Sequence, residues 1–219
     1  MNRQDDSLAA PNGVGRQIEE IELIGGVLCL DFVNSLSGTR KEPVERLHDY
    51  GELVRWTAHA GAIEPGEVEP LAAAGAARPG EAEAVFDRAL ALRESIFRAF
   101  DALAHGAGPP AADLERLNRE LARALPHMRI EPDEHGFDYR FETESGALDR
   151  PLWPIARSAA ELLAEGDLAR VKECSSDECG WLFVDLSKNK SRRWCDMRDC
   201  GNRAKARRYY RRQRRGREN

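Results

Sequence analysis

Two pairs of cysteines near the C-terminal end constrain this 219-residue chain more than any other feature. Cys174 and Cys179 form one pair, and Cys195 and Cys200 form the other, each with four residues between its members. Zn²⁺ takes four thiolates in a closed tetrahedral site, and such a site is structural. We therefore expect one Zn²⁺ per chain at these cysteines. A pair of disulfides is the weaker alternative in a reducing compartment, and iron–sulfur clusters use other spacings.

The segment around the cysteines holds few apolar side chains, so it is expected to need a metal in order to fold. Metal binding contributes roughly 10–16 kcal/mol of apparent free energy to small domains of this kind. Residues 181–184 are β-forming, a polar loop follows at 187–191, and residues 192–194 return toward the second pair. We expect residues 181–184 and 192–194 to pair as a hairpin before a helix, in a treble-clef-like finger over 173–217. Residues 167–172 would link this finger to the rest.

The second cysteine pair leads directly into an arginine-rich tail. From residue 172 to residue 219 the chain holds 15 Lys and Arg against 7 Asp and Glu. Residues 204–215 contain good helix formers and no Pro or Gly, so they predict a helix covered with positive charge. Phosphates would satisfy such a helix best, because each neutralised contact releases counterions. A solvated basic tail that binds acidic surfaces nonspecifically is the alternative.

Nine basic residues are therefore the candidate contacts to nucleic acid. Five lie on the expected helix and four on the preceding loop: Arg203, Arg207, Arg208, Arg211 and Arg212, then Lys188, Lys190, Arg192 and Arg193. Tyr209 and Tyr210 lie between arginines, where a ring can stack or hydrogen-bond to sugar and phosphate. Asn202, at the start of the helix, either has a structural role as a cap or brace, or contacts a base.

The residues before the finger predict a mostly helical domain over 18–166 with one small β-hairpin, an α+β fold that is mainly α. A short helix is expected from Cys29 onward. Alternating residues at 127–131 and 137–141 flank the turn Pro-Asp-Glu-His-Gly, which predicts the hairpin. Residues 1–17 predict a disordered leader. Apolar side chains at helical spacing predict four further helices, over 47–62, 79–105, 113–125 and 152–163.

The sequence offers no catalytic constellation. The five histidines are scattered singly, and neither a Gly-x-Ser-x-Gly turn nor a glycine-rich phosphate loop occurs. Cys29 lies in an apolar run, where a thiol behaves as a small hydrophobic side chain. No stretch approaches the roughly 20 apolar residues that cross a bilayer. We therefore expect a cytoplasmic protein that is not an enzyme and has no membrane partner.

Two segments resemble a known family. The four cysteines match the ligands of the CGNR-type zinc finger, and residues 200–203 read Cys-Gly-Asn-Arg, the motif that names it. Residues 25–34, with the sequence Gly-Gly-Val-Leu-Cys-Leu-Asp-Phe-Val-Asn, and the region of Trp56 resemble the ABATE domain that precedes this finger. Members are regarded as bacterial transcription regulators and are often called stress-induced. The resemblance thus implies that the finger binds DNA.

The two parts of the chain carry opposite charge, which suggests how the protein is regulated. Residues 172–219 have a net charge of +8, whereas the preceding 171 residues have −13. We hypothesise that the acidic domain controls access to the finger, either by sensing a small-molecule effector or through homodimerisation. An RNA-binding or ribosome-associated adaptor is the alternative to a DNA-binding regulator, because zinc knuckles with arginine tails also bind RNA. An enzyme with a structural zinc would instead need a polar cleft in the N-terminal domain.

Overall fold

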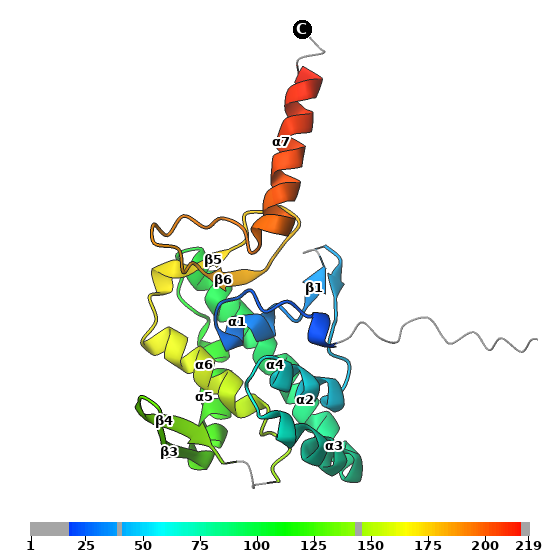
Figure 1. Cartoon of the computed structure of the whole chain (residues 1–219), viewed down its shortest axis with the longest axis vertical. Coiled ribbons are helices and arrows are strands. Elements are labelled where there is room, and N and C mark those ends of the chain that lie inside the picture. Colours follow the sequence, from blue (N-terminus) through cyan, green and yellow to red (C-terminus); the bar gives the residue numbers. More distant parts are fainter. Residues whose placement is uncertain (1–17, 39–40, 143–145, 216–219) are drawn as a thin grey trace, which may run out of the picture.

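The computed structural model describes residues 18–38, 41–142 and 146–215, without the side chains of Arg211, Arg212, Arg214 and Arg215. The predicted leader, residues 1–17, lies outside the described residues. Figure 1 shows a body of helices with the finger at one end, and α7 (Asn202–Arg215) projecting beyond it.

Every helix that the apolar periodicity predicts is present. The segments 47–62, 79–105, 113–125 and 152–163 and the helix expected near Cys29 appear as α2 (Tyr50–His59), α4 (Pro79–Ala104), α5 (Ala111–Ala124), α6 (Leu152–Ala164) and α1 (Leu28–Val33). Single turns precede, separate or follow these helices: η1 (Ile18–Glu20), η2 (Pro65–Glu67), η3 (Leu125–His127) and η4 (Leu168–Arg170). In the described part of the chain, no helix combines the length and the apolar character of a membrane span.

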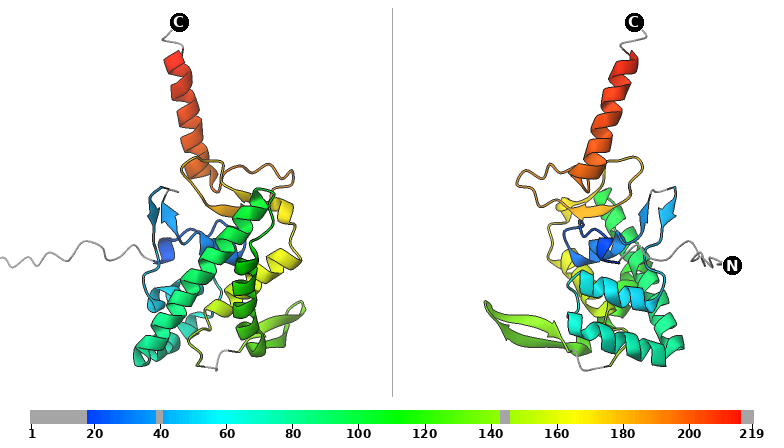
Figure 2. Two further views of the ribbon diagram at one scale, coloured as in Figure 1. Left: turned by 180° about the vertical axis from the view of Figure 1, so that it is seen from behind. Right: turned by 45° about the vertical axis from the view of Figure 1, so that its right-hand side comes forward.

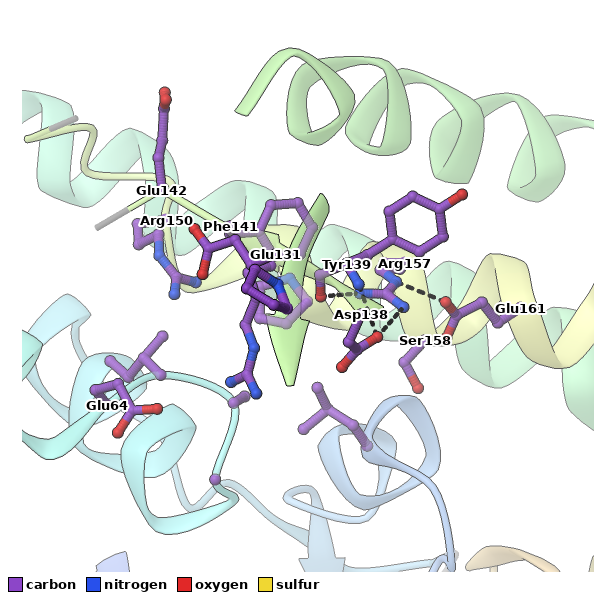
Figure 3. Close-up of a pocket in the computed structure, with 17 residues that line it drawn as sticks. Glu64, Glu131, Asp138, Tyr139, Phe141, Glu142, Arg150, Arg157, Ser158 and Glu161 are labelled. Atoms are coloured by element: carbon purple, nitrogen blue, oxygen red, sulfur yellow. Dashed lines mark hydrogen bonds and ion pairs between the residues drawn. The ribbon is translucent and has the colours of Figure 1, made fainter. Parts of the chain in front are cut away.

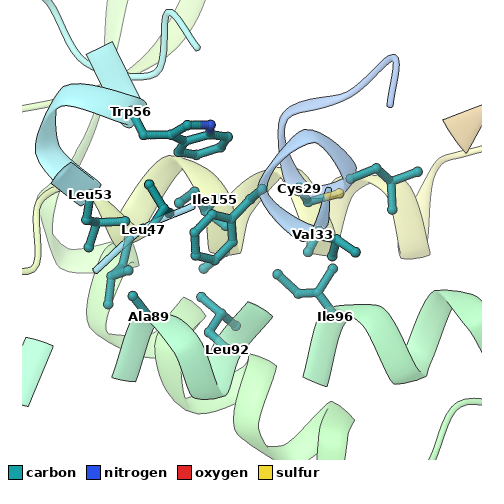
Figure 4. Close-up of a cluster of buried hydrophobic side chains, with 14 of the residues drawn as sticks. Cys29, Val33, Leu47, Leu53, Trp56, Ala89, Leu92, Ile96 and Ile155 are labelled. Carbon is teal, nitrogen blue, oxygen red and sulfur yellow. The ribbon is translucent and has the colours of Figure 1, made fainter. Parts of the chain in front are cut away.

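The core of the body lies where α1, α2, α4 and α6 meet (Figure 4). Ala89, Leu92 and Ile96 recur along one face of α4 and are fully buried there. Across from them the rings of Phe32 and Trp56 pack with their centroids 5.2 Å apart. An apolar stripe of this width needs neighbours on several sides, which explains why α4 lies among the other helices.

The predicted hairpin is formed by β3 (Met128–Asp133) and β4 (Gly136–Phe141), which pair antiparallel with Ile130 opposite Tyr139. Figure 2 shows it reaching away from the helical body. Arg157 of α6 holds strand β4 of the hairpin, because Nη1 of Arg157 donates to the Tyr139 carbonyl oxygen at 2.8 Å. The outer part of the hairpin is open to solvent.

Within the domain before the finger, one helix and two strands were not predicted, the helix α3 (Val68–Ala77) and the paired strands β1 (Ser37–Gly38) and β2 (Pro43–Val44). The Ala/Gly-rich sequence of α3 has little amphipathic pattern. Gly75 lets this helix approach α2, since a Cβ there would lie 2.7 Å from Cδ1 of the Tyr50 ring.

The predicted pairing within the finger is wrong. Residues 182–184 form β6 (Leu182–Val184), but its partner is β5 (Val171–Glu173), with Val171 opposite Val184 and Glu173 opposite Leu182. Residues 192–194 form no strand. The hairpin therefore lies across the first cysteine pair instead of after it, and β5 occupies part of the segment expected to be a linker.

The finger packs directly onto the helical body. Val171, Leu182 and Val184 belong to the same buried cluster as the core of the helices. Asn34, which follows α1 and is fully buried, donates through Nδ2 to the Leu182 carbonyl at 2.9 Å and accepts from the Leu182 N–H at 3.1 Å. Gly25 contributes a third bond, since its carbonyl accepts from the Val184 N–H at 2.8 Å. The strand β6 is thus hydrogen-bonded on both sides.

Candidate metal centre and basic helix

The four predicted cysteines come together in one buried cluster. Sγ of Cys195 lies 3.7 Å from Sγ of Cys179 and of Cys200, and all four sulfur atoms lie within 4.8 Å of one another. Four thiolates at the usual Zn–S distance of about 2.3 Å in a tetrahedron are about 3.8 Å apart. All four cysteines are buried. The cluster therefore fits one structural Zn²⁺ ion with four sulfur ligands.

The two ligand pairs come from two turns of backbone. Cys174 follows β5 and Cys179 precedes β6, so the first pair spans the turn of that hairpin. Cys200 lies in η5 (Met197–Gly201), a π-helical turn that continues into α7, and Cys195 precedes it. A metal bound here joins the hairpin to the first residues of α7.

The thiols of this cluster share their protons unequally: the hydrogen bonds that Cys179 and Cys195 make to Cys174 raise their own pKa values, and of these three only Cys174 is held as a thiolate. Hydrogen bonds from the Cys179 and Cys195 thiols hold the pKa of Cys174 well below its usual range, and the thiolate is the form that binds metal. Cys29 differs, because burial in the core of the body raises its pKa to about 12. Its thiol stays protonated and packs as a small apolar group, as the sequence predicted.

Gly201 and Asn202, the middle residues of the Cys-Gly-Asn-Arg motif, shape the turn that enters α7. A Cβ on Gly201 would lie 2.5 Å from Sδ of Met197, so a larger residue would displace that side chain. Nδ2 of Asn202 donates to the Arg198 carbonyl oxygen at 2.9 Å. Of the two roles weighed for Asn202, its side chain therefore takes the bracing one in this structure.

Arg203, the last residue of the motif, turns back toward the cysteines. Its Nη2 lies 3.2 Å from Sγ of Cys200 and 2.8 Å from Oδ2 of Asp199. The hydrogen bond to the Cys200 sulfur raises the pKa of Arg203, and Asp199 adds to the effect. The guanidinium thus lies between a ligand sulfur and a carboxylate.

Asp185 organises the loop between the cysteine pairs, a role that the sequence did not reveal. Its buried carboxylate accepts from Lys172 Nζ at 2.6 Å, from the Ser187 hydroxyl at 2.5 Å and from the Arg192 N–H at 2.9 Å. Burial alone would raise the pKa of Asp185, but these donors hold it well below its usual range. The buried Asp185 carboxylate therefore holds in place the loop that carries four of the predicted basic contacts.

Arg192 is folded into the finger. Its guanidinium carbon lies 4.3 Å from the centre of the Phe183 ring. It also donates to three carbonyl oxygens, those of Ile24, Trp194 and Cys195. A side chain held in this way supports the loop and presents little of its charge to a partner.

The other three loop residues are exposed. Lys190 is ion-paired, with Nζ 2.7 Å from Oδ2 of Asp167. Arg193 lies over the Trp194 ring, 5.2 Å from its centre. Lys188 is exposed and has no ion pair within the described part of the chain. Lys188 and Arg193 thus form the accessible positive edge of the loop.

The helical candidates lie along α7, which contains no acidic residue. Arg207 forms an ion pair with Glu178 from the first cysteine turn. Arg208 is exposed and has no ion pair among the described residues. Arg211 and Arg212 belong to the same helix, but their side chains lie outside the description.

The N-terminal domain contains a cavity of about 650 Å³ between the β3–β4 hairpin, α6 and the loop at 61–64 (Figure 3). Arg150 lines it and is only 6% exposed. Its Nε lies 2.9 Å from Oε1 of Glu67, yet within the described residues its Nη1 has no hydrogen-bond partner. Burial lowers the pKa of Arg150, although Glu67 opposes the shift. Arg150 is therefore a buried cation in the wall of the cavity, and one of its donors has no partner among the described residues.

Two family models match the chain, in the order that the resemblance implied. Residues 26–166 match ABATE, described as "Putative stress-induced transcription regulator", and residues 170–213 match the CGNR zinc finger. No curated protein matches the chain. The first match alone covers more than half of the sequence. The chain therefore belongs to the ABATE family and carries a C-terminal CGNR zinc finger.

Proposed function

We propose that this chain is a transcription regulator that binds DNA through α7 and the positive edge of the finger loop. The observation that carries the proposal is the exposed surface of α7, where Lys205, Arg208, Tyr209 and Tyr210 all face solvent. Because α7 projects from the body, phosphates would reach it without displacing another element (Figure 1). Positive side chains with aromatic rings among them bind the backbone of nucleic acids.

The proposed contacts are the predicted basic residues whose charged groups no contact among the described residues holds inside the finger; two of them, Arg207 and Lys190, form ion pairs with Glu178 and Asp167 that a phosphate would have to replace. On α7 the contacts are Arg207, Arg208, Arg211 and Arg212, and on the loop Lys188 and Arg193, with Lys190 beside them. Arg192 is assigned to holding the loop, because its guanidinium already serves three carbonyl groups. The zinc site fixes where α7 begins, so the basic side chains of α7 would have a defined position relative to the finger.

The salt dependence of binding tests the proposal. Zinc-loaded full-length protein is titrated onto a labelled random-sequence duplex at several KCl concentrations, and fluorescence anisotropy gives the affinity. For Arg208→Gln we expect the slope of log K against log salt to fall by about 0.9, the value for one lost phosphate contact. Arg119→Gln, which removes an exposed arginine of α5, is the matched control and should leave the slope unchanged. A wild-type slope for R208Q would contradict a role of this residue in DNA binding.

An RNA-binding or ribosome-associated adaptor remains the second candidate, because the same basic helix would suit an RNA backbone. The two are separated by competition in one buffer between the duplex and a structured RNA of equal length. Displacement by RNA at a much lower concentration than by DNA would favour the adaptor. The matching families are a regulator family and a zinc-finger family, so we propose no catalytic activity.

We further propose that the cavity of Figure 3 is the effector site, and that its ligand is a small zwitterion such as an amino acid. A ligand carboxylate would be attracted to Arg150, whose buried Nη1 has no partner among the described residues and would have to shift to reach the cavity; the unsatisfied donor, which costs roughly 1–3 kcal/mol, favours that shift. Glu64, Glu131 and Asp138 also line the cavity and could receive an ammonium group. The ring of Tyr139 adds a less polar wall. Bound there, a ligand would contact the hairpin and α6 together.

Calorimetric titration of the full chain with the 20 common L-amino acids tests this site. At least one is expected to bind, and Arg150→Lys should weaken it tenfold or more because the guanidinium fork is lost. Glu131→Gln at the exposed rim is the second variant, in case Arg150 proves necessary for folding. If no amino acid binds the folded wild-type protein at millimolar concentration, the effector proposal is wrong.

Homodimerisation also stays a prediction. Sedimentation velocity of the full chain checks it.

A further inference from the structure

The residues of the Cys-Gly-Asn-Arg motif have structural roles in the finger. Its cysteine is a metal ligand, Gly201 packs against Met197, and Asn202 bonds to the Arg198 carbonyl. Arg203 was expected to reach nucleic acid, as was Asn202 in one of its two possible roles. We infer that Arg203 is instead a positioning residue of the metal centre, which hydrogen-bonds the Cys200 thiolate and makes no contact to DNA.

Charge gives the first reason. Four thiolates around one Zn²⁺ carry a net charge of −2, and donors to the sulfur atoms reduce the cost of burying it. Cys174 obtains such a donor from the backbone, the N–H of Cys195 at 3.4 Å. Cys200 obtains one from a side chain, Nη2 of Arg203 at 3.2 Å. A charged donor makes a stronger hydrogen bond than a neutral one.

The second reason is that the guanidinium is already held between two anions. Asp199, one helical turn before Arg203, accepts from the same Nη2 at 2.8 Å. A phosphate at this position would have to approach both the Asp199 carboxylate and the negatively charged metal cluster. Arg208 has no such neighbours among the described residues and is exposed. Repulsion from these two anions therefore disfavours phosphate binding at Arg203. Within the described part of the chain, no such repulsion acts at Arg208, further along α7.

The experiment compares three variants of the full-length zinc-loaded protein, Arg203→Gln, Arg203→Lys and Arg208→Gln. Zinc release to a chromophoric chelator is followed by absorbance. Removing a partner of a metal ligand usually costs about 10–100-fold in metal affinity, and for R203Q we expect this loss to show as zinc release that is faster by about the same factor. R203K keeps the charge but loses the fork, so it should fall between R203Q and wild type. R208Q should release zinc at the wild-type rate.

A second readout uses the Co²⁺-substituted protein. Its thiolate-to-cobalt absorption should shift in R203Q, since the sulfur loses a hydrogen bond, and should stay unchanged in R208Q. The duplex titration described above is then repeated at saturating zinc. R203Q is expected to keep the wild-type salt slope, whereas R208Q loses about 0.9.

Two results would overturn the inference. One is zinc release from R203Q at the wild-type rate. The other is a salt slope reduced by about 0.9 in zinc-saturated R203Q, which would place the guanidinium on a phosphate. The zinc and cobalt measurements do not depend on DNA binding, so they remain decisive even if the proposed function fails. If R203Q does not fold, R203K supplies the zinc-release and cobalt comparisons; its salt slope is not used, because lysine keeps the charge that would neutralise a phosphate.

Discussion

Asp31 is an acidic side chain in the core of the body, 8% exposed, and its Oδ1 accepts the Gly25 N–H at 2.7 Å. Burial raises its pKa from 3.8 to about 6, and this hydrogen bond offsets only part of the shift. The folded protein therefore holds the proton more tightly than the unfolded chain does. Stability from this residue is fully present below about pH 4 and is lost as the pH rises through about 6.

We predict that Asp31→Asn removes this pH dependence. A shift of about two pKa units corresponds to roughly 3 kcal/mol, so D31N should gain up to that amount over wild type near pH 7 and little near pH 4. Urea unfolding of both proteins across this range gives the difference. Asp87→Asn, on an exposed position of α4, controls for the loss of one carboxylate and for the pH dependence of zinc binding. A difference between D31N and wild type that does not change with pH would refute the assignment.

At the scale of elements, prediction succeeded where one segment carries its own pattern. The stripe of α4 and the alternation in β3 and β4 are local signals, so both elements were predicted close to their observed bounds. The helix α3 failed this criterion because its Ala/Gly-rich sequence is nearly uniform in polarity. The strand β5 has only three residues, too few to show alternation, so the partner of β6 could not be recognised. The nearer segment at 192–194 was chosen instead.

At the metal site too, features with a local sequence pattern were predicted, and contacts between distant residues were not. Cysteine count and spacing predicted the thiol cluster, since few other roles need four such residues. The sequence shows that Arg192 is basic but not that its side chain bonds to three carbonyl groups of the finger. The bonds of Asn34 to Leu182 join residues 148 positions apart. Asp185 likewise looked like one acidic residue among many, although it holds the loop. Contacts of this kind exist only after the chain has folded.

At the scale of the whole molecule, the finger shares its hydrophobic core with the helical body. Leu182 and Val184 of β6 are buried among residues of the body, and Asn34 satisfies both polar groups of Leu182. The metal fixes the turn between β5 and β6, so its loss should loosen β6. That change would leave the Asn34 side chain without its partners in a buried position, which is costly. The body should therefore respond to an ion that it does not itself bind.

We predict that chelating zinc from the full chain loosens part of the N-terminal domain. Hydrogen exchange should become faster by tenfold or more at the amides of α1 and of residues 34–36, because their packing against β6 is lost. The amides of α3 serve as the internal control, since this helix lies at the end of the body away from the finger (Figure 1). Asn34→Ala in the zinc-loaded protein should reproduce the faster exchange in α1 without removing the metal. Unchanged exchange in α1 after chelation would mean that the finger and the body fold independently, despite their common core.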